Sequence, residues 1–324
     1  MDLDRIIQLV VVLIGVPAVL VGYVALVEWL MQRLPPKRQP QVRPWLWIGP
    51  GVILLILFLV YPTLNTIYLS FLNAKSTNFV GLTNYVYALT NRDMLLAMRN
   101  NIFWLVFFTG FTVAFGLLIA VLTDRVPYES AAKALIFLPM AISSVAAGVI
   151  WKFMYDFRPA GQAQTGTLNA VVTTLTAKPQ PWLIQQPTNN AFLIFVGVWM
   201  MAGFAMVILS AGLKGISEEV LEAARVDGAN EWNVFWQIKI PLLSSTIAVV
   251  TTTIIITALK TFDIVYVMTN GNYNTDVVAR LMYQTMFNVR DYGRASAMAV
   301  VLLVAIVPIM IINIRRFQEQ EAMR

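Results

Sequence analysis

The chain has no cysteine and no histidine, and only 12% of its 324 residues are charged. Without cysteine there is no disulfide and no thiolate nucleophile. Without histidine the most common general base and the usual zinc and haem ligands are missing. We therefore expect no metal site, and any chemistry would depend on carboxylates, lysines or hydroxyl groups.

Hydrophobic residues, in contrast, make up 58% of the chain. Apolar runs repeatedly reach the roughly 20 residues that a helix needs to cross about 30 Å of hydrocarbon. The predicted fold class is therefore an all-α polytopic membrane protein. We expect seven spans, at about residues 6–31, 45–69, 102–123, 131–154, 191–213, 243–262 and 295–314.

The basic residues indicate how the spans are oriented. The net charge is +6, but Lys and Arg lie at the ends of apolar runs, so membrane orientation explains them better than binding to nucleic acid. Segment 33–44, RLPPKRQPQVRP, has four basic residues and four prolines, and is predicted to be non-helical and cytoplasmic. Alternation then places the N-terminus outside and the C-terminus in the cytoplasm.

Three further segments carry local predictions. The first apolar run lacks a basic n-region and a cleavage motif, so it is interpreted as a retained helix, with a removable signal peptide as the alternative. Segment 79–101 favours an interfacial amphipathic helix over a simple connector. Segment 155–190, rich in Gly, Pro, Gln and Thr, is expected to be an exposed outer loop.

A charged block, SEEVLEAARVDGANEWNVFWQIKIPL, fills residues 217–242 between two apolar runs. Ser217 is a suitable N-cap, and Asp227-Gly228 a suitable end, for a first short helix. Asn230 can cap a second short helix, which we expect to end before Pro241.

The two short helices should differ in their exposed faces. Glu218, Glu222 and Arg225 share one face of the first helix. The second helix places Trp232, Phe235 and Trp236 on one face, which is expected to pack on the protein's own spans. The polar face would allow another protein to approach closely, and a solvated loop that binds nothing is the alternative.

The spacing within this block resembles the EAA loop of bacterial ABC importer permeases. The pattern is E-A-A-x-x-x-G, then nine residues, then I-x-x-P. Further segments are similar to the MalF-type, carbohydrate-uptake branch of that family: YPTLNTIYLSF (61–71), FVGLTNY (79–85), LPMAISSVAAGVIWKFMYD (138–156), LKTFDIVYVMTNG (259–271) and YGRASAMAV (292–300). Segment 150–169 is most similar to permeases for α-glucosides and glucosylglycerol. The chain departs from the family at Asn272-Tyr273, where Gly-Pro is common.

The resemblance implies a division of the chain and a set of partners. Residues 1–44 would be an additional N-terminal helix and linker, 45–316 a six-span type I permease domain with a coupling loop at 214–242, and 317–324 a cytoplasmic tail. The protein would lie in a bacterial inner membrane. An extracytoplasmic solute-binding protein would deliver a sugar or glycoside, a second and distinct permease would complete the path, and two cytoplasmic ATPase subunits would drive it.

The same resemblance assigns the coupling residues. Contact with the ATPase is implied for Glu222, Ala223, Ala224, Asp227, Gly228, Ile238 and Pro241. The chain contains no G-x-x-x-x-G-K-[ST] phosphate-binding loop, so ATP and magnesium are expected on the partner ATPase and no cofactor on this chain.

The solute path should be built on the spans that flank the loop, because a polyhydroxy solute needs hydroxyl groups and aromatic faces in an apolar wall. The candidate residues are Gly197, Trp199, Met200, Met201, Phe204, Thr253, Thr257, Lys260 and Thr261, with Ser143 and Ser144 as further candidates after a kink at Pro139. The alternatives stay open: threonines that bond back to their own helix, packing residues, and a simple Lys260–Asp263 ion pair.

Two other functions compete with this one. An ion-coupled secondary transporter would need ionisable residues at mid-membrane and repeat symmetry, and neither is visible in the sequence. A non-transporting scaffold subunit of a membrane complex remains open.

Overall fold

A computed structural model describes residues 3–124, 126–176 and 178–322. Throughout these residues the regular elements are helices, and the only strand-like pairing described is an isolated bridge between Leu72 and Phe79. The chain divides into two compact units, residues 1–65 and residues 66–324. The prediction of an all-α protein is confirmed.

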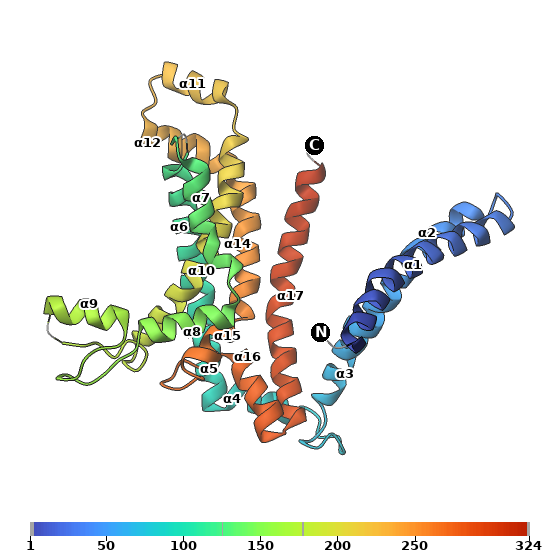
Figure 1. Cartoon of the computed structure of the whole chain (residues 1–324), viewed down its shortest axis with the longest axis horizontal. Coiled ribbons are helices and arrows are strands. Elements are labelled where there is room, and N and C mark those ends of the chain that lie inside the picture. Colours follow the sequence, from blue (N-terminus) through green and yellow to red (C-terminus); the bar gives the residue numbers. More distant parts are fainter. Residues whose placement is uncertain (1–2, 125, 177, 323–324) are drawn as a thin grey trace. The chain divides into compact units, whose positions relative to one another are not determined.

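The N-terminal unit is a helical hairpin (Figure 1). Its elements are α1 (Leu3–Arg33), α2 (Gln39–Leu55), η1 (Ile56–Val60) and the beginning of α3 (Tyr61–Leu69). Glu28 and Arg43 join the two arms in an ion pair of 2.8 Å. The side-chain amide of Gln39 donates to the carbonyls of Met31 and Leu34, at 3.0 and 3.1 Å, and so satisfies carbonyl groups at the end of α1.

The predicted non-helical linker is therefore shorter than expected. Only residues 34–38 separate the two helices, and α2 begins at Gln39. Pro40 falls in the first turn of α2, where a missing N–H costs no hydrogen bond, while Pro44 is accommodated inside the helix. The prediction that residues 33–44 are non-helical was wrong for the second half of that segment.

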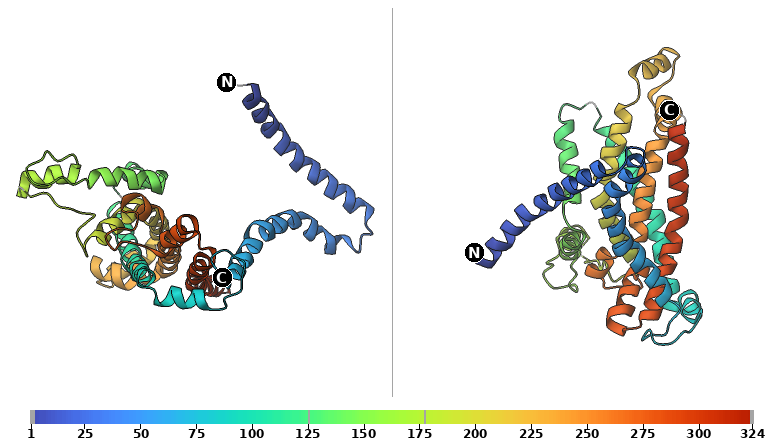
Figure 2. Two further views of the ribbon diagram at one scale, coloured as in Figure 1. Left: turned by 90° about the horizontal axis from the view of Figure 1, so that it is seen from below. Right: turned by 90° about the vertical axis from the view of Figure 1, so that its right-hand side faces the viewer.

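The second unit contains the remaining helices (Figure 2). They are α4 (Thr83–Thr90), α5 (Arg92–Phe103), η2 (Trp104–Phe108), α6 (Thr109–Leu122), α7 (Glu129–Phe137), η3 (Leu138–Ala141), α8 (Ser144–Met154), α9 (Thr167–Thr176), α10 (Asn189–Lys214), α11 (Glu218–Val226), α12 (Glu231–Val234), η4 (Phe235–Lys239), α13 (Ile240–Leu242), α14 (Ser244–Leu259), α15 (Asp263–Met268), α16 (Val278–Tyr283), η5 (Gln284–Val289) and α17 (Tyr292–Ala322).

Among the described residues, five helices are long and apolar enough to cross a membrane, and two bent helix pairs bring the number to as many as seven. The straight spans are Val11–Arg33, Gln39–Leu69, Arg92–Leu122, Asn189–Lys214 and Tyr292–Ile312. The bent pairs are Glu129–Ala141 with Ser144–Met154, at 98°, and Glu231–Leu242 with Ser244–Leu259, at 67°. The first of these bends follows Pro139, as the sequence predicts.

The third span begins earlier than predicted. Asn91 caps α5 by accepting hydrogen bonds from the backbone N–H groups of Asp93 and Met94, at 2.9 and 3.2 Å. The helix then runs without a break to Leu122, so much of segment 79–101 belongs to the span, and only the short α4 is a separate helix. An interfacial position for α4 stays a prediction.

Helix α10 forms the centre of the second unit and is its most buried span. Small residues let its neighbours approach closely. A Cβ atom on Gly116 of α6 would lie 2.4 Å from the Cβ of Ala205, and one on Gly203 of α10 would lie 2.4 Å from the carbonyl oxygen of Ile136. Such close backbone approach is how membrane helices gain packing energy without a hydrophobic driving force between them.

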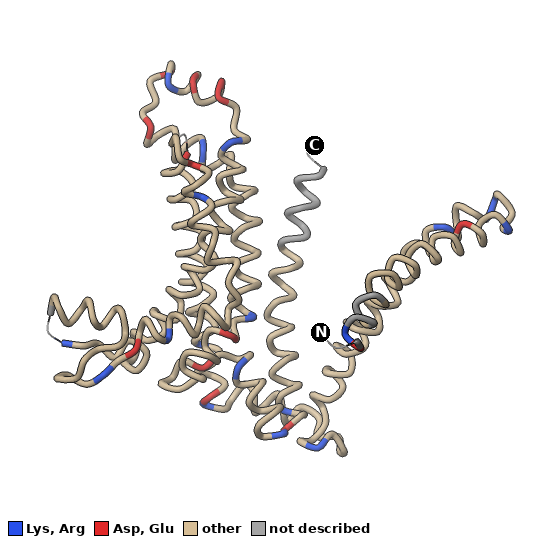
Figure 3. The backbone as a smooth tube through the Cα atoms, in the orientation of Figure 1, with Lys and Arg blue, Asp and Glu red and all other residues tan. Residues whose placement is uncertain are grey.

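Charged residues of the second unit gather toward the two ends of its helices (Figure 3). One end holds the predicted loop, with α11 and α12, and the opposite end holds α4, α15, α16 and the outer loop that contains α9 (Figure 1). Within the outer loop, Asn169 holds the chain by donating to the carbonyls of Asp156 and Gln180, at 2.8 and 3.0 Å. The last residues of the predicted tail, 323–324, lie outside the described residues.

Candidate functional site

The first short helix of the charged block forms as predicted. Ser217 occupies the N-cap position of α11, although its hydroxyl donates to Glu219, at 2.8 Å, and caps no backbone N–H. The helix ends at Val226 with Asp227 as its C-cap, and Gly228 follows with φ of +87°, in the left-handed region that glycine adopts without strain. The predicted stop at Asp227-Gly228 is confirmed.

The second helix begins as predicted but does not end there. The Asn230 side chain accepts from the backbone N–H of Asn233, at 2.8 Å, and caps α12. The chain then continues through the π-helical η4 and through Pro241 to Leu242. A proline clashes with the carbonyl four residues before it in a regular α-helix, whereas the wider turn of η4 precedes Pro241 here. The predicted end before Pro241 was wrong.

One residue from each short helix anchors the loop. Leu221 and Val234 are buried, and Arg225 and Glu231 join the two helices through an ion pair of 2.8 Å. The hydrogen bond to the Glu231 carboxylate raises the pKa of Arg225 above its ordinary value. The two helices are thus held to each other across the glycine turn.

The predicted coupling residues lie on the outer side of this loop. Glu222, Ala223, Asp227, Gly228 and Pro241 are exposed, while Ala224 and Ile238 are half-buried. The loop therefore presents a rigid helix whose acidic and small residues are open to a partner.

The aromatic face, however, does not pack on the protein's own spans. Trp232 and Trp236 are 70% and 50% exposed, and they contact each other edge to face with ring centroids 5.7 Å apart. The prediction for this face was wrong, because the burial of Leu221 and Val234 already fixes which side of each helix turns toward the spans.

A charged cluster lies directly behind the loop. Glu129 of α7 forms ion pairs with Lys133 and, at 2.6 Å, with Lys214 at the end of α10; Lys133 also donates to Ser210. This cluster borders a cavity of about 250 Å³ that reaches Glu218 and Leu221 of α11. It connects the ends of two spans to the base of the loop.

A second cavity, of about 270 Å³, lies where the break between α14 and α15 meets η2, α8 and α10. Seven predicted path residues line it: Ser144, Gly197, Met200, Met201, Thr257, Lys260 and Thr261. These residues come from three segments far apart in the sequence. The fold therefore brings together most of the predicted path residues at one place.

Four predicted path residues lie outside this cavity. Trp199 packs edge to face on Trp151, and Phe204 packs against the hydrophobic core. Thr253 is exposed and bonds back to the carbonyl of Val249, at 3.0 Å, and the Ser143 hydroxyl caps α8 by accepting from Ala146 N, at 3.2 Å. Their roles in a solute path stay predictions.

The cavity also has lining residues that the sequence did not single out as path candidates. Trp104, Phe108, Ile256, Phe262, Asp263 and Ile264 complete the wall. The ion pair between Lys260 and Asp263, one of the alternatives left open above, is absent among the described residues, and both side chains border the cavity instead. The signal for Asp263 was visible in the sequence: a carboxylate directly after an apolar span, three residues from a lysine.

The hydroxyl groups of Thr257 and Thr261 both form hydrogen bonds within their own chain segment. Thr257 donates to the Thr253 carbonyl at 2.9 Å, and Thr261 donates to the Thr257 carbonyl at 3.4 Å. This bonding back to the helix matches the alternative interpretation of these residues. A hydroxyl that donates in this way still has lone pairs free to accept from a solute.

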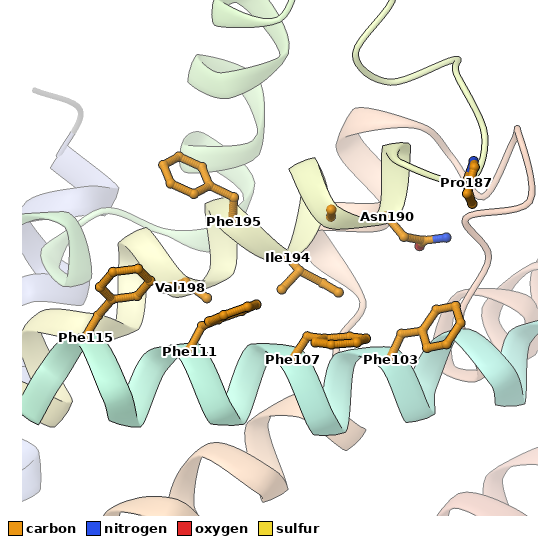
Figure 4. A pocket seen from close by; sticks show the side chains of 10 residues that line it. Phe103, Phe107, Phe111, Phe115, Pro187, Asn190, Ile194, Phe195 and Val198 are labelled. Atoms are coloured by element: carbon orange, nitrogen blue, oxygen red, sulfur yellow. The ribbon is translucent and has the colours of Figure 1, made fainter.

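A larger groove of about 450 Å³ on another face of α10 is almost wholly apolar (Figure 4). Phe103, Phe107, Phe111 and Phe115 form one wall at helical spacing, and Ile194, Phe195 and Val198 of α10 form the other. Asn190 is its one polar lining side chain. A polyhydroxy solute would find too few hydrogen-bond partners there.

Comparison with known proteins identifies the kind of molecule. Residues 112–316 match the family described as "Binding-protein-dependent transport system inner membrane component". The chain belongs to this family. It is the membrane-embedded permease component of an ABC importer, and it is a multi-pass inner-membrane protein.

Two relatives are similar over most of the chain. The "Osmoprotective compounds uptake permease protein GgtC" of Synechocystis sp. is 56% identical over 279 residues, 86% of this chain and 100% of the relative. The "Alpha-glucoside transport system permease protein AglF" of Rhizobium meliloti is 49% identical over 275 residues, 85% of this chain and 82% of the relative. The resemblance to an importer permease is therefore confirmed, and the secondary transporter is excluded.

A solved structure has the same fold. The bacterial ABC transporter "involved in the import of the acidic polysaccharide alginate" contains a chain that is 24% identical, with a TM-score of 0.71 over 84% of this chain and 96% of that one. The predicted importer-permease fold class is thus confirmed at the level of tertiary structure.

Proposed function

We propose that this permease forms half of the path for a small glycoside, either an α-glucoside or glucosylglycerol. The main support for this proposal is the cavity beside α14, where Ser144, Met201 and Thr257 from three separate segments meet. The names of the relatives GgtC, an uptake permease for osmoprotective compounds, and AglF, an α-glucoside permease, support a compatible solute or an α-glucoside.

The chemistry of the cavity suits such a solute. Lys260 supplies hydrogen-bond donors, Asp263 supplies acceptors, and Trp104 and Phe262 supply aromatic faces for a sugar ring. Its volume of about 270 Å³ is just below the roughly 300–1,000 Å³ typical of small-molecule sites. A second permease, which we propose to be a distinct homologue, would complete the wall.

Helix α11 would couple transport to ATP hydrolysis. Glu222 to Gly228 would dock into a groove on a cytoplasmic ATPase subunit, and two such subunits would bind ATP and magnesium. The support is the exposure of Glu222, Ala223 and Asp227 on a helix that Leu221 anchors from behind. A rigid helix tied to spans on both sides can transmit a rotation of the ATPase to the solute path.

The opposite end of the second unit would face an extracytoplasmic solute-binding protein. This follows from the family description and from the position of the loop at the other end of the helices. With the loop in the cytoplasm and seven spans, the N-terminus would lie outside and the C-terminus inside.

The function is tested with the reconstituted complex of both permeases, the ATPase and the binding protein. Glucosylglycerol or an α-glucoside should stimulate ATP hydrolysis when the loaded binding protein is present. Stimulation by neither, with stimulation by an unrelated solute such as an amino acid, would refute the glycoside assignment. A scaffold role predicts that substitutions in the cavity leave solute preference unchanged.

A further inference from the structure

Two consecutive asparagines, Asn100 and Asn101, lie inside the third span, at the end of the unit opposite the coupling loop. Their exposed fractions are 0% and 5%. Polar side chains within membrane helices are costly unless they are fully bonded, and their partners therefore indicate their purpose. Neither residue touches the cavity, so the proposed function leaves both without a role.

Asn100 holds the outer loop between α15 and α16. Its side-chain amide donates to the carbonyls of Asn274 and Asp276, both at 2.8 Å. Asn189 of α10 adds a bond to the carbonyl of Tyr273, also at 2.8 Å. Tyr273 and Asn274 have φ of 58° and 61°, a conformation that non-glycine residues adopt only when their surroundings enforce it. The loop is thus fixed in one shape.

Asn101 connects this loop to the end of α14. Its side-chain oxygen accepts from the backbone N–H of Val278, at 2.9 Å, and its amide donates to the carbonyl of Leu259, at 3.5 Å. Leu259 is the last residue of α14 and is buried, and the final carbonyls of a helix have no partner within the helix. One side chain therefore joins the first residue of α16 to the last residue of α14.

This join lies next to the solute cavity. Lys260 and Thr261, which line the cavity, directly follow Leu259. Trp104, the first residue of η2, follows Asn101 of α5 by less than one helical turn and lines the same cavity. A Cβ atom on Gly197 would lie 2.9 Å from the Trp104 ring, so the ring has no room to shift toward α10.

We propose that Asn101 is a positioning residue for solute recognition. It fixes the end of α14 against the outer loop, and thereby sets where Lys260 and Thr261 stand in the cavity. The inference rests on the proposed function, because it assumes that this cavity receives the glycoside. Asn101 itself contacts no solute and acts through the backbone at Leu259.

The test measures uptake of labelled glucosylglycerol and a labelled α-glucoside by the reconstituted complex. The variant Asn101→Leu removes both hydrogen bonds. The matched control is Asn84→Leu: Asn84 is also a buried asparagine whose amide donates to two carbonyls, those of Ser70 and Leu72, at 2.9 and 2.7 Å, but it lies away from the cavity. If Asn101→Leu does not assemble, Asn101→Ser gives the same readout, because its hydroxyl is too short to reach both partners.

In Asn101→Leu, KM should rise about fivefold to tenfold, and the ratio of kcat/KM for the two glycosides should change. In Asn84→Leu, the amount of transporter can fall, but KM and the ratio should stay at wild-type values. Unchanged KM and ratio in both Asn101 variants, or an equal shift in the control, would overturn the inference. Failure of the proposed function would be seen earlier, as a wild-type complex that takes up neither glycoside, and the inference would fall with it.

Discussion

Lys260 and Asp263 stand on either side of the break between α14 and α15, and both border one cavity without pairing with each other. Lys260 is at the C-cap of α14, where a positive charge is favoured, and Asp263 is in the first turn of α15, where a negative charge is favoured. The helix ends thus hold both charges in place. Their donors and acceptors stay available to a solute.

Removing either charged group should weaken solute recognition. We expect Lys260→Ala and Asp263→Asn each to raise KM for uptake about tenfold, because hydrogen bonds to charged groups contribute about 1.5–3 kcal/mol. Uptake rates measured over a range of solute concentrations give KM. The control is Lys178→Ala, an exposed lysine of the outer loop, which should behave as wild type. An unchanged KM in both cavity variants would contradict the role of this pair.

The negative charge of Glu222 on the coupling helix α11 should be essential for coupling ATP hydrolysis to transport. Glu222→Lys is expected to leave the protein inserted in the membrane but to abolish solute-stimulated ATP hydrolysis. Val220→Lys also places a lysine on α11, but Val220 is two residues from Glu222 and therefore lies on the opposite face of the helix, so this variant should retain most activity. Equal activity in the two variants would argue against docking through the Glu222 face.

The glycine turn behind the coupling helix gives a separate prediction. Gly228 has φ of +87°, and proline is restricted to about −65°. Gly228→Pro should therefore displace α12 from α11 and uncouple transport, with normal amounts of protein in the membrane. Uptake at the wild-type rate would show that the turn has no part in coupling.

The packing of α6 on α10 depends on Gly116 but not on Gly110, the other glycine of α6. A Cβ at Gly116 would meet the Cβ of Ala205 at 2.4 Å, whereas a Cβ at Gly110 would meet nothing within 4 Å. Gly116→Ala should cost about 1–3 kcal/mol of stability, and Gly110→Ala should cost little. Thermal unfolding in detergent compares the two, and equal midpoints would contradict the close packing.

The sequence predicted well those features that depend on local chemistry. The caps and stops of the short helices follow from Asn230 and Gly228, and the break in the fourth span follows from Pro139. Apolar length alone indicated the spans. Each of these signals acts within a few residues of where it appears.

Features set by tertiary contacts were harder to predict. Trp104 and Phe108 look like ordinary span residues, and only the close approach of α10 at Gly197 makes them part of the cavity wall. The early start of the third span likewise depends on the outer loop, because its backbone satisfies Asn100 and Asn101. Pro241 remains in a helix because a π-helical turn precedes it, and the residues before Pro241 carry no local signal for such a turn.

The cavity beside α14 is the proposed binding site of the glycoside. Met201 lines this cavity, and the larger side chain in Met201→Trp should reduce the space left for a solute. The variant should therefore change the relative uptake of glucosylglycerol and an α-glucoside, measured side by side in the reconstituted complex. We predict a shift in that preference, with the larger solute losing more. The same preference as wild type, together with normal uptake, would contradict the account.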